Sequence, residues 1–322
     1  MEKPPGICHQ NEPRLKVVIL GANGFIGQHL TRFLLKKDLE LVLFSRKFDP
    51  DLLELEQNEN VKIVKGSLSE VSKVTDVLKG ADLVYHLIWT SVPATSWENP
   101  YEEIKQNVLP GIKMLEICVN QGVKKVVFVS SAGTVYGEYH GTAVEGSSLA
   151  PFSPYGISKA TLEFYMQYFQ RKSGLNFDVF RISNLYGVGL NKKGFGVINT
   201  WLRKIQREEP LMVLGDGSAK KDFVFIDDAI KVLANSIDYD LAKSRLYNVC
   251  SSESITLKEL IDLLFKVCQT QSPVIFDKAK ASDNKEVLLS NRLILEDKII
   301  EKFTSLEKGV SMIWQEMNQN PE

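Results

Sequence analysis

The chain has 322 residues, with 44 % hydrophobic and 25 % charged side chains, and its 39 basic and 40 acidic residues leave a formal net charge of −1. This composition predicts a globular protein with a buried core, and it lacks the basic excess that a nucleic-acid-binding protein usually carries. No apolar run is long enough to cross a membrane, the polar start does not resemble a signal peptide, and the 4 cysteines lack metal-ligand spacing, so we expect a cytoplasmic protein that binds no membrane and no metal.

Short apolar runs alternate with amphipathic segments over the first part of the chain. The β-branched run KVVIL at 16–20 is typical of a buried parallel strand, and QHLTRFLLKK at 28–37 places apolar residues at helical spacing. Strands that alternate with helices predict parallel β-α-β units and therefore a doubly wound α/β sheet of the Rossmann type. The other expected strands are 41–45, 61–65, 81–87, 123–131 and 177–182, and the other helices are about 70–79, 101–121 and 154–172.

The pattern changes after Tyr186, where Gly187 and Gly189 interrupt the chain. We expect helices at about 196–207, 227–237 and 256–268, a strand at 223–226, and a segment at 246–250 that returns to the main sheet. The predicted organisation is a flexible tail at 1–14, a dinucleotide-binding domain at 15–186 to which 223–250 partly return, and a smaller mixed substrate-binding lobe at 187–322.

A G-x-x-G-x-x-G turn joins the first expected strand to the first helix. Its glycines permit a tight turn and let the backbone approach a pyrophosphate at the amino terminus of a helix, so the sequence predicts a dinucleotide cofactor. The candidate cofactor-binding residues of this turn are Gly21, Asn23, Gly24, Phe25, Ile26 and Gly27.

The acidic residue that would bind an adenosine ribose hydroxyl is absent from the end of the second strand. Ser45, Arg46 and Lys47 stand there instead. Their positive charges can hold a 2′-phosphate, which favours NADP over NAD, and the alternative is a solvated basic loop beside either cofactor. Ser67, after the third strand, is a further candidate beside the adenine.

Tyr155 and Lys159 lie four residues apart at the start of an expected helix, so they share one helix face. A nearby ammonium and a positively charged nicotinamide ring stabilise a phenolate, which lowers the tyrosine pKa and makes Tyr155 a candidate proton acceptor for a substrate hydroxyl. Lys159 is also a candidate for binding the nicotinamide ribose. A chance pair on a surface helix is the alternative interpretation.

Several segments between about residues 15 and 316 resemble one enzyme family in their order and content. They are GANGFIG, HLIWTSVPATSWENP, QNVLPG, SSAGTVYG, SPYGISK, FRISNLYG, GFGVINTWL, GDGSAKKDFVFIDD and SLEKGV. The chain is similar to the extended short-chain dehydrogenase/reductases, the NAD(P)-dependent nucleotide-sugar epimerases and dehydratases, and most of all to the UDP-glucose and UDP-N-acetylglucosamine 4-epimerases.

The resemblance implies a nucleotide diphosphate sugar of the UDP type as substrate, with Tyr155 as the base and Lys159 as its electrostatic partner. It also implies a homodimer formed through the helices at 101–121 and 155–172. The further cofactor contacts that it implies are Leu68, Leu87, Asn107 and Ile182, and the further substrate contacts are Asn184, Gly196 and Val197.

The catalytic hydroxyl of the family falls on Ala132 in this chain. Thr134 is therefore the first candidate to bond the substrate oxygen, and Ser131 is the second. Lysines at positions 221 and 280 replace two arginines that grip the diphosphate in the family, so Lys221 and Lys280 keep the charge but lose the bidentate fork.

Another departure follows the fourth expected strand, where Ile88 and Trp89 replace small residues that lie beside the cofactor in the family. Trp89 either fills the core or reshapes the nicotinamide pocket. Each alternative is compatible with the sequence.

We expect a nucleotide-sugar 4-epimerase, in which Tyr155 takes the proton of the 4-hydroxyl while hydride passes to the cofactor and returns to the opposite face of a 4-keto sugar. The runner-up is an NADPH-dependent reductase of a 4-keto sugar nucleotide. A 4,6-dehydratase is disfavoured, because Gly133 and Thr134 replace the Asp-Glu pair of those enzymes. A non-catalytic dinucleotide-binding sensor is the alternative from a different class of protein.

Overall fold

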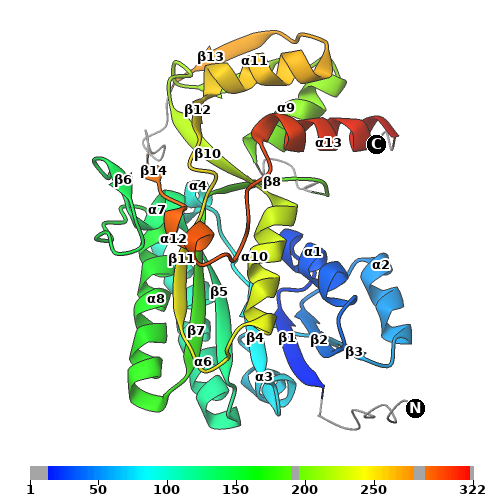
Figure 1. Cartoon of the computed structure of the whole chain (residues 1–322), viewed down its shortest axis with the longest axis vertical. Coiled ribbons are helices and arrows are strands. Elements are labelled where there is room, and N and C mark those ends of the chain that lie inside the picture. Colours follow the sequence, from blue (N-terminus) through cyan, green and yellow to red (C-terminus); the bar gives the residue numbers. More distant parts are fainter. Residues whose placement is uncertain (1–13, 190–195, 279–286, 320–322) are drawn as a thin grey trace, which may run out of the picture.

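The structure is a computed structural model and describes residues 14–189, 196–278 and 287–319. Within these residues, seven parallel strands form the main sheet in the order β3-β2-β1-β4-β5-β7-β11. Figure 1 shows this sheet in the larger, lower part of the molecule. The strands are β1 (Leu15–Leu20), β2 (Leu39–Ser45), β3 (Val61–Lys65), β4 (Leu83–His86), β5 (Lys125–Ser131), β7 (Asn176–Ile182) and β11 (Arg245–Val249).

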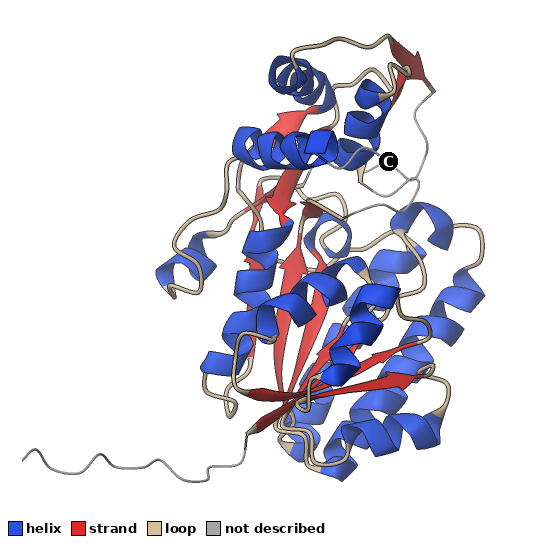
Figure 2. Cartoon of the chain, turned by 90° about the vertical axis from the view of Figure 1, so that its right-hand side faces the viewer, coloured by secondary structure: helices blue, strands red, loops and turns tan. Residues whose placement is uncertain are grey.

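Helices cover both faces of the main sheet, as Figure 2 shows. On one face α1 (Phe25–Leu34) packs against α10 (Ile226–Asp238), and on the other α3 (Val71–Leu78), α6 (Leu109–Gln121) and α8 (Pro154–Ser173) pack together. Each layer buries its own apolar cluster against the sheet, so the predicted doubly wound α/β architecture is confirmed. None of the helices in the described ranges combines the length and the apolar character that a membrane span requires.

The smaller part of the molecule contains a mixed sheet and a second pair of strands. β10 (Lys220–Phe225) lies between β8 (Asn184–Tyr186), which runs parallel to it, and β12 (Ser254–Thr256), which runs antiparallel. β9 (Leu211–Leu214) pairs in parallel with β13 (Val274–Asp277). The predicted smaller mixed part is therefore present, and Figure 1 shows it above the main sheet with α9 (Val197–Gln206), α11 (Leu257–Cys268) and α13 (Leu306–Gln319).

Short elements connect these larger ones. Strands β6 (Thr142–Ala143) and β14 (Leu288–Leu289) pair in parallel. This pair joins the loop after α7 (Ala132–Val135) to the segment before α12 (Arg292–Glu296). The short elements are α2 (Pro50–Leu53), a 3₁₀ turn η1 (Glu54–Gln57), α4 (Pro93–Ser96), α7 (Ala132–Val135), β6 (Thr142–Ala143), β14 (Leu288–Leu289) and α12 (Arg292–Glu296).

The helix predicted at 101–121 is interrupted in the structure. α5 (Pro100–Glu103) passes into a π-helical turn, η2 (Ile104–Val108), and α6 follows from Leu109. Pro110, in the first turn of α6, has no N–H with which to continue an α-helical ladder, so the chain widens before it. Such π turns are frequent at functional sites.

Strands β1 and β4 are neighbours in the main sheet. The strands that follow β1 in the chain, β2 and β3, lie on one side of this pair, and those that follow β4, β5 and β7, lie on the other. The ends of β1 and β4 stay in contact, because the N–H of Leu87 donates to Leu20 O at 2.8 Å. In open α/β sheets, ligands bind outside the carboxyl ends of the strands at such a reversal of order. The glycine turn after β1 and residues 87–92 after β4 therefore flank the expected ligand position.

Candidate active site

The glycine turn has no room for a side chain where it is tightest. A Cβ at Gly27 would lie 2.2 Å from Gly21 O, and Gly21 itself has φ +98°, which favours glycine. Helix α1 begins after Gly24 without a side-chain cap, so the N–H groups of Phe25 and Ile26 in its first turn have no helical partner. These N–H groups fit the anionic diphosphate of a dinucleotide.

Asn23 connects the glycine turn to the loop after β2. Its side chain accepts a hydrogen bond from the N–H of Asp49 at 2.9 Å and donates one to the Asp49 carboxylate at 3.4 Å, and that carboxylate also accepts from Gln28 at 2.7 Å. Ser45 is partly buried at the end of β2, and Arg46 is exposed. The predicted basic edge therefore has an acidic neighbour, Asp49, which the sequence analysis did not single out.

The other predicted cofactor residues lie near the ends of the main strands. The N–H of Ser67 donates to the Glu70 carboxylate at 2.7 Å, and Leu87 directly follows β4. Leu68 and Ile182 are only 7 % and 3 % exposed, so their side chains present little surface to a ligand.

Tyr155 stands in the first turn of α8, and the sequence around it explains why the helix begins there. The Ser153 side chain caps the helix by accepting from the N–H of Gly156 at 3.1 Å, and Pro154 occupies a position where its missing N–H is harmless. The N–H of Tyr155 donates to Ser96 Oγ of α4 at 3.2 Å. The N–H groups of Tyr155 and of the next residue are therefore both hydrogen-bonded to serine hydroxyls.

Ser131, at the end of β5, lines the same cavity as Tyr155, and its side chain acts on the Tyr155 hydroxyl. Burial raises the pKa of the phenol and the Glu103 carboxylate raises it further, whereas the side chain of Ser131 opposes the shift. Tyr155 is therefore a neutral phenol at neutral pH and can donate a proton. The base predicted from the sequence needs the additional positive charge of a bound ligand.

The ammonium of Lys159 is enclosed by aromatic rings. Its Nζ donates to Val129 O at 2.8 Å and lies 3.7 Å from the ring centre of Trp89 and 4.8 Å from that of Phe128. Burial lowers the Lys159 pKa to about 7, although two nearby carboxylates act in the opposite direction. The predicted pair does come together, since the same Nζ lies 5.6 Å from the ring centre of Tyr155.

A polar network holds the Trp89 indole. Its Nε1 donates to Glu103 Oε1 at 3.0 Å, and the same oxygen accepts from Asn107 at 3.1 Å. Asn107 Oδ1 accepts in turn from the N–H and the hydroxyl of Thr90 at 2.9 and 3.1 Å. Asn107, a predicted cofactor contact, is 2 % exposed, and its amide is hydrogen-bonded within this network.

Ala132 begins α7 and is fully buried in an apolar cluster. Three hydroxyl-bearing residues surround it in the chain. Ser130 is buried, and its hydroxyl donates a hydrogen bond to the Glu163 carboxylate. Ser131 and Thr134 line a cavity that Tyr155 also borders. The structure therefore brings both predicted substitute hydroxyls to the same cavity as the tyrosine.

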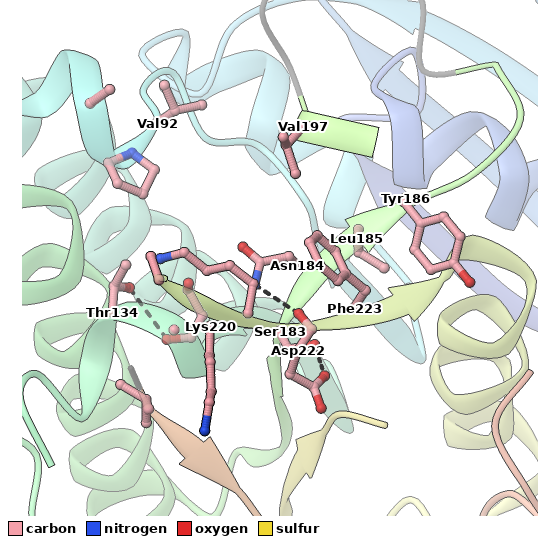
Figure 3. A pocket seen from close by; sticks show the side chains of 18 of the residues that line it. Val92, Thr134, Ser183, Asn184, Leu185, Tyr186, Val197, Lys220, Asp222 and Phe223 are labelled. Carbon is pink, nitrogen blue, oxygen red and sulfur yellow. Dashed lines mark hydrogen bonds between the residues drawn. The ribbon is translucent and has the colours of Figure 1, made fainter. Parts of the chain in front are cut away.

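This cavity has a volume of ≈ 610 Å³ and lies between the ends of the main strands and the smaller part of the molecule. Figure 3 shows Val92, Thr134, Asn184 and Val197 around it, each from a separate segment of the chain. The predicted substrate-binding residues that line the cavity are Thr134, Asn184, Gly196, Val197 and Lys221, and the predicted Lys280 lies outside the described residues.

Strand β10 brings positive charge to the cavity through Lys220 and Lys221. The next carboxylate, that of Asp222, is buried and accepts hydrogen bonds from Ser183 at 2.6 Å and Ser251 at 2.8 Å. The wall thus suits an anionic group such as a diphosphate. Within the described ranges, no group of three or more His, Cys, Asp or Glu side chains could hold a metal ion.

Most of the apolar lining was not predicted from the sequence. Met212 and Leu214 of β9 face the cavity and alternate with the buried Leu211 and Val213. A period of two is the signal of a strand, but four apolar residues in a row conceal it. The other unpredicted lining residues include Val92, Pro93, Ala94, Trp201 and Lys220.

Comparison with known proteins assigns the chain to a family. Residues 17–250 match the NAD dependent epimerase/dehydratase family. The chain is 31 % identical to the dTDP-4-dehydro-6-deoxyglucose reductase of Escherichia coli over 255 residues, which are 77 % of this chain and 80 % of that protein.

Solved structures agree with the fold. The UDP-N-acetylglucosamine 4-epimerase of Methanobrevibacter ruminantium M1, in complex with UDP-N-acetylmuramic acid, is 26 % identical with a TM-score of 0.86, and the match covers 96 % of this chain and 99 % of that one. The UDP-glucose 4-epimerase of Thermotoga maritima is 24 % identical with a TM-score of 0.88, and the match covers 96 % and 100 %. The main sheet, the glycine turn and the match over residues 17–250 lead to one conclusion: the chain belongs to the NAD dependent epimerase/dehydratase family.

Proposed function

We propose that this protein reduces the 4-keto group of a nucleotide diphosphate sugar, with a nicotinamide dinucleotide as the hydride donor. The observation that carries the proposal is the shared cavity, which is lined by the phenol of Tyr155, the hydroxyls of Ser131 and Thr134, and the positive charge of Lys221. A neutral phenol can give its proton to a carbonyl oxygen, as a reduction requires. The 31 % identity to a reductase of a nucleotide-linked 4-keto sugar supports this direction of reaction.

The residues of the glycine turn fit the cofactor. Gly21 and Gly27 keep the backbone open to a diphosphate, and the uncapped start of α1 offers its N–H groups to the negative charge. A bound nicotinamide dinucleotide supplies the hydride. The exposed Arg46 beside Ser45 supports NADPH, whereas Asp49 beside the turn supports NADH, so both donors belong in the test.

Tyr155 donates its proton to the oxygen on C4 as that oxygen gains negative charge. The hydroxyls of Ser131 and Thr134 donate hydrogen bonds to the same oxygen. The ammonium of Lys159, 5.6 Å from the tyrosine ring centre, stabilises the phenolate that remains. The phenolate then recovers a proton from water.

The nucleotide end of the substrate lies against the smaller part of the molecule. The ammonium groups of Lys220 and Lys221 attract the diphosphate, and the apolar side chains of Trp201, Met212 and Leu214 offer a surface for the base. A lysine binds phosphate as a point charge without the fixed fork of an arginine, so this wall accepts more than one diphosphate geometry.

A nucleotide-sugar 4-epimerase is the second candidate, and the free space around Gly133 favours it. A Cβ added at Gly133 would have no other atom within 4 Å, so the cavity wall leaves room beside the catalytic hydroxyls. A 4-keto sugar must turn over between two hydride transfers in an epimerase, and such room permits that movement. The similarity to two 4-epimerase structures supports the same candidate.

We also propose that the protein forms a homodimer through the outer face of α5, η2, α6 and α8. Large apolar side chains are exposed along this face, and two of them, Tyr101 and Leu109, are 70 % and 57 % exposed. Contiguous apolar surface of this kind is typical of an interface between proteins. The exposed apolar residues of this face are Tyr101, Ile104, Leu109, Ile157, Phe164, Tyr165 and Tyr168.

The decisive experiment gives the purified protein a dTDP- or UDP-linked 4-keto-6-deoxy sugar with NADPH or NADH. A reductase consumes the reduced cofactor in a 1:1 ratio with the keto sugar, which the nicotinamide absorbance and product chromatography measure. An epimerase instead interconverts UDP-sugars without net change in that absorbance. Tyr155→Phe is the matched control, since it must abolish either activity. If the unsubstituted protein binds the dinucleotide but turns over none of these sugars, and Tyr155→Phe binds it equally well, the protein is a sensor.

A further inference from the structure

Trp89 lies where the strand order of the main sheet reverses. It belongs to residues 87–92, which have no regular secondary structure and follow β4, and β4 pairs with the strand that leads into the glycine turn. The two segments are in contact, because a Cβ added at Gly21 would lie 3.0 Å from Leu87 C and 3.2 Å from Ile88 Cγ1. The indole therefore stands at the crevice that a dinucleotide uses in open α/β sheets.

The indole covers the ammonium of Lys159. Nζ lies 3.7 Å from the centre of the Trp89 ring, and its other close neighbours are Val129 O at 2.8 Å and the ring of Phe128 at 4.8 Å. Lys159 is 5 % exposed whereas Trp89 is partly exposed, so the indole is the outer of the two groups. A cation against an aromatic face is held by the ring quadrupole, and more strongly when water is excluded.

The indole is also anchored on its other side. Its Nε1 donates to Glu103 Oε1 at 3.0 Å, and Glu103 is 3 % exposed and accepts a second hydrogen bond from Asn107 on the π turn. The ring therefore has two specific attachments, one to a buried anion and one to a buried cation. The ring also packs against the buried apolar cluster that contains Phe128, so these two attachments are additional to its packing.

We infer that Trp89 is a gate on the cofactor site: its indole takes the ligand side of the Lys159 ammonium, and a nicotinamide dinucleotide binds fully only after the indole turns away. The inference rests on the proposed function, because it takes the ligand to be such a dinucleotide. Opening breaks the hydrogen bond to Glu103 and frees two donors of the ammonium for ribose hydroxyls. The gate lowers cofactor affinity and so suits a cofactor that is exchanged at every turnover.

Isothermal titration calorimetry of the cofactor-free protein with NAD⁺ and with NADP⁺ tests the gate. Trp89→Ala removes the ring, so we expect a dissociation constant about 10- to 30-fold lower than in the unsubstituted protein. Trp89→Phe keeps a ring without the bond to Glu103. Its dissociation constant should fall between those of the unsubstituted protein and Trp89→Ala. Trp97→Ala is the matched control, because Trp97 is 42 % exposed and its ring contacts Phe152, whereas the rings near the Lys159 ammonium are those of Trp89, Phe128 and Tyr155. This substitution should leave the dissociation constant unchanged.

The same substitution in a protein that lacks the Lys159 charge shows whether the indole affects cofactor affinity through the ammonium. Lys159→Met keeps an unbranched side chain without the charge, so adding Trp89→Ala to it should change the dissociation constant by less than about twofold. If Trp89→Ala does not fold, as its melting curve will show, Trp89→Phe alone carries the comparison in both backgrounds.

The possible results are distinct. An unchanged or higher dissociation constant in Trp89→Ala, with a dinucleotide still bound by the unsubstituted protein, overturns the gate and leaves the proposed function standing. A gain that persists in full in the Lys159→Met background also overturns the gate as stated. Failure of both proteins to bind either dinucleotide overturns the gate and the proposed function together.

Discussion

The guanidinium of Arg181 on β7 holds both carboxylate oxygens of Glu163 on α8, with Nε at 3.2 and 3.1 Å and Nη2 at 2.7 Å. The two side chains are 3 % and 1 % exposed, and Ser130 of β5 donates to the same carboxylate at 2.5 Å. Glu163 lies one helical turn after Lys159. The ion pair therefore ties α8 to β7 one turn away from the buried Lys159 and two turns away from Tyr155, which lines the cavity.

Glu163→Gln should destabilise the protein by about 3–5 kcal/mol, because it leaves a buried guanidinium without its anion. Urea unfolding followed by circular dichroism measures the change. Glu296→Gln is the control: its partner Arg292 is 81 % exposed, so the loss there should stay below about 1 kcal/mol. Equal losses in the two variants would contradict the role given to the buried pair.

Gly27→Ala should abolish dinucleotide binding, since the added Cβ would meet Gly21 O at 2.2 Å and force the turn apart. Calorimetric titration with NAD⁺ and NADP⁺ measures the loss. Gly146→Ala adds the same methyl group where no atom lies within 4 Å and should bind as the unsubstituted protein does. Retained affinity in Gly27→Ala would mean that the turn is not the diphosphate site.

Ala132→Ser should lower stability by about 1–3 kcal/mol without raising kcat, because position 132 is fully buried and a hydroxyl there has no partner in an apolar cluster. Thr134→Val and Ser131→Ala, which remove hydroxyls that line the cavity, should each lower kcat by at least about tenfold. Melting curves and steady-state kinetics of the three variants separate these effects. A higher kcat in Ala132→Ser would show that position 132 reaches the substrate after all.

His86 should make the protein sensitive to acid. Burial and the nearby Lys159 lower the His86 pKa from 6.5 to about 3, and among the described residues neither ring nitrogen has a hydrogen-bond partner. Between pH 6.5 and 3 the unfolded chain therefore binds a proton at His86 that the folded chain does not. The free energy of unfolding receives the full contribution of His86 above pH 6.5. Below that pH it falls by about 1.4 kcal/mol per pH unit. His86→Phe keeps an aromatic ring against Phe128 and should remove this part of the slope.

The comparison of unfolding free energies between pH 4 and 6 checks this expectation. Both proteins share every other titrating group, so the difference between their slopes isolates position 86. Identical slopes would mean that the imidazole takes up its proton in the folded protein.

Helix α8 is predictable from the sequence because local residues mark its ends. Ser153 and Pro154 begin it, and Gly174 ends it with φ +72°. The central strands of the main sheet are predictable for a similar reason, since β1 and β5 contain β-branched runs that are largely buried. The glycine turn completes the part of the site that sequence alone predicts.

The remainder of the site depends on contacts between distant segments. Strand β8 has three residues and exists because β10, far along the chain, pairs with it. The sequence leaves open whether Trp89 fills the core or reshapes the cofactor pocket, and in the structure it packs on the cluster around Phe128 while contacting Glu103 and Lys159. No local pattern encodes either partner.

The loop that carries Trp89 also ends at the cavity that Tyr155 borders. Three residues later Val92 leads into α4, whose Val92–Ala94 region lines the cavity and whose Ser96 accepts from the N–H of Tyr155. If the indole turns away as proposed and this movement shifts residues 92–94, each ligand will alter the affinity of the other by the same factor. Such a coupling is measurable as a single constant from either side, whichever of the two ligands binds first.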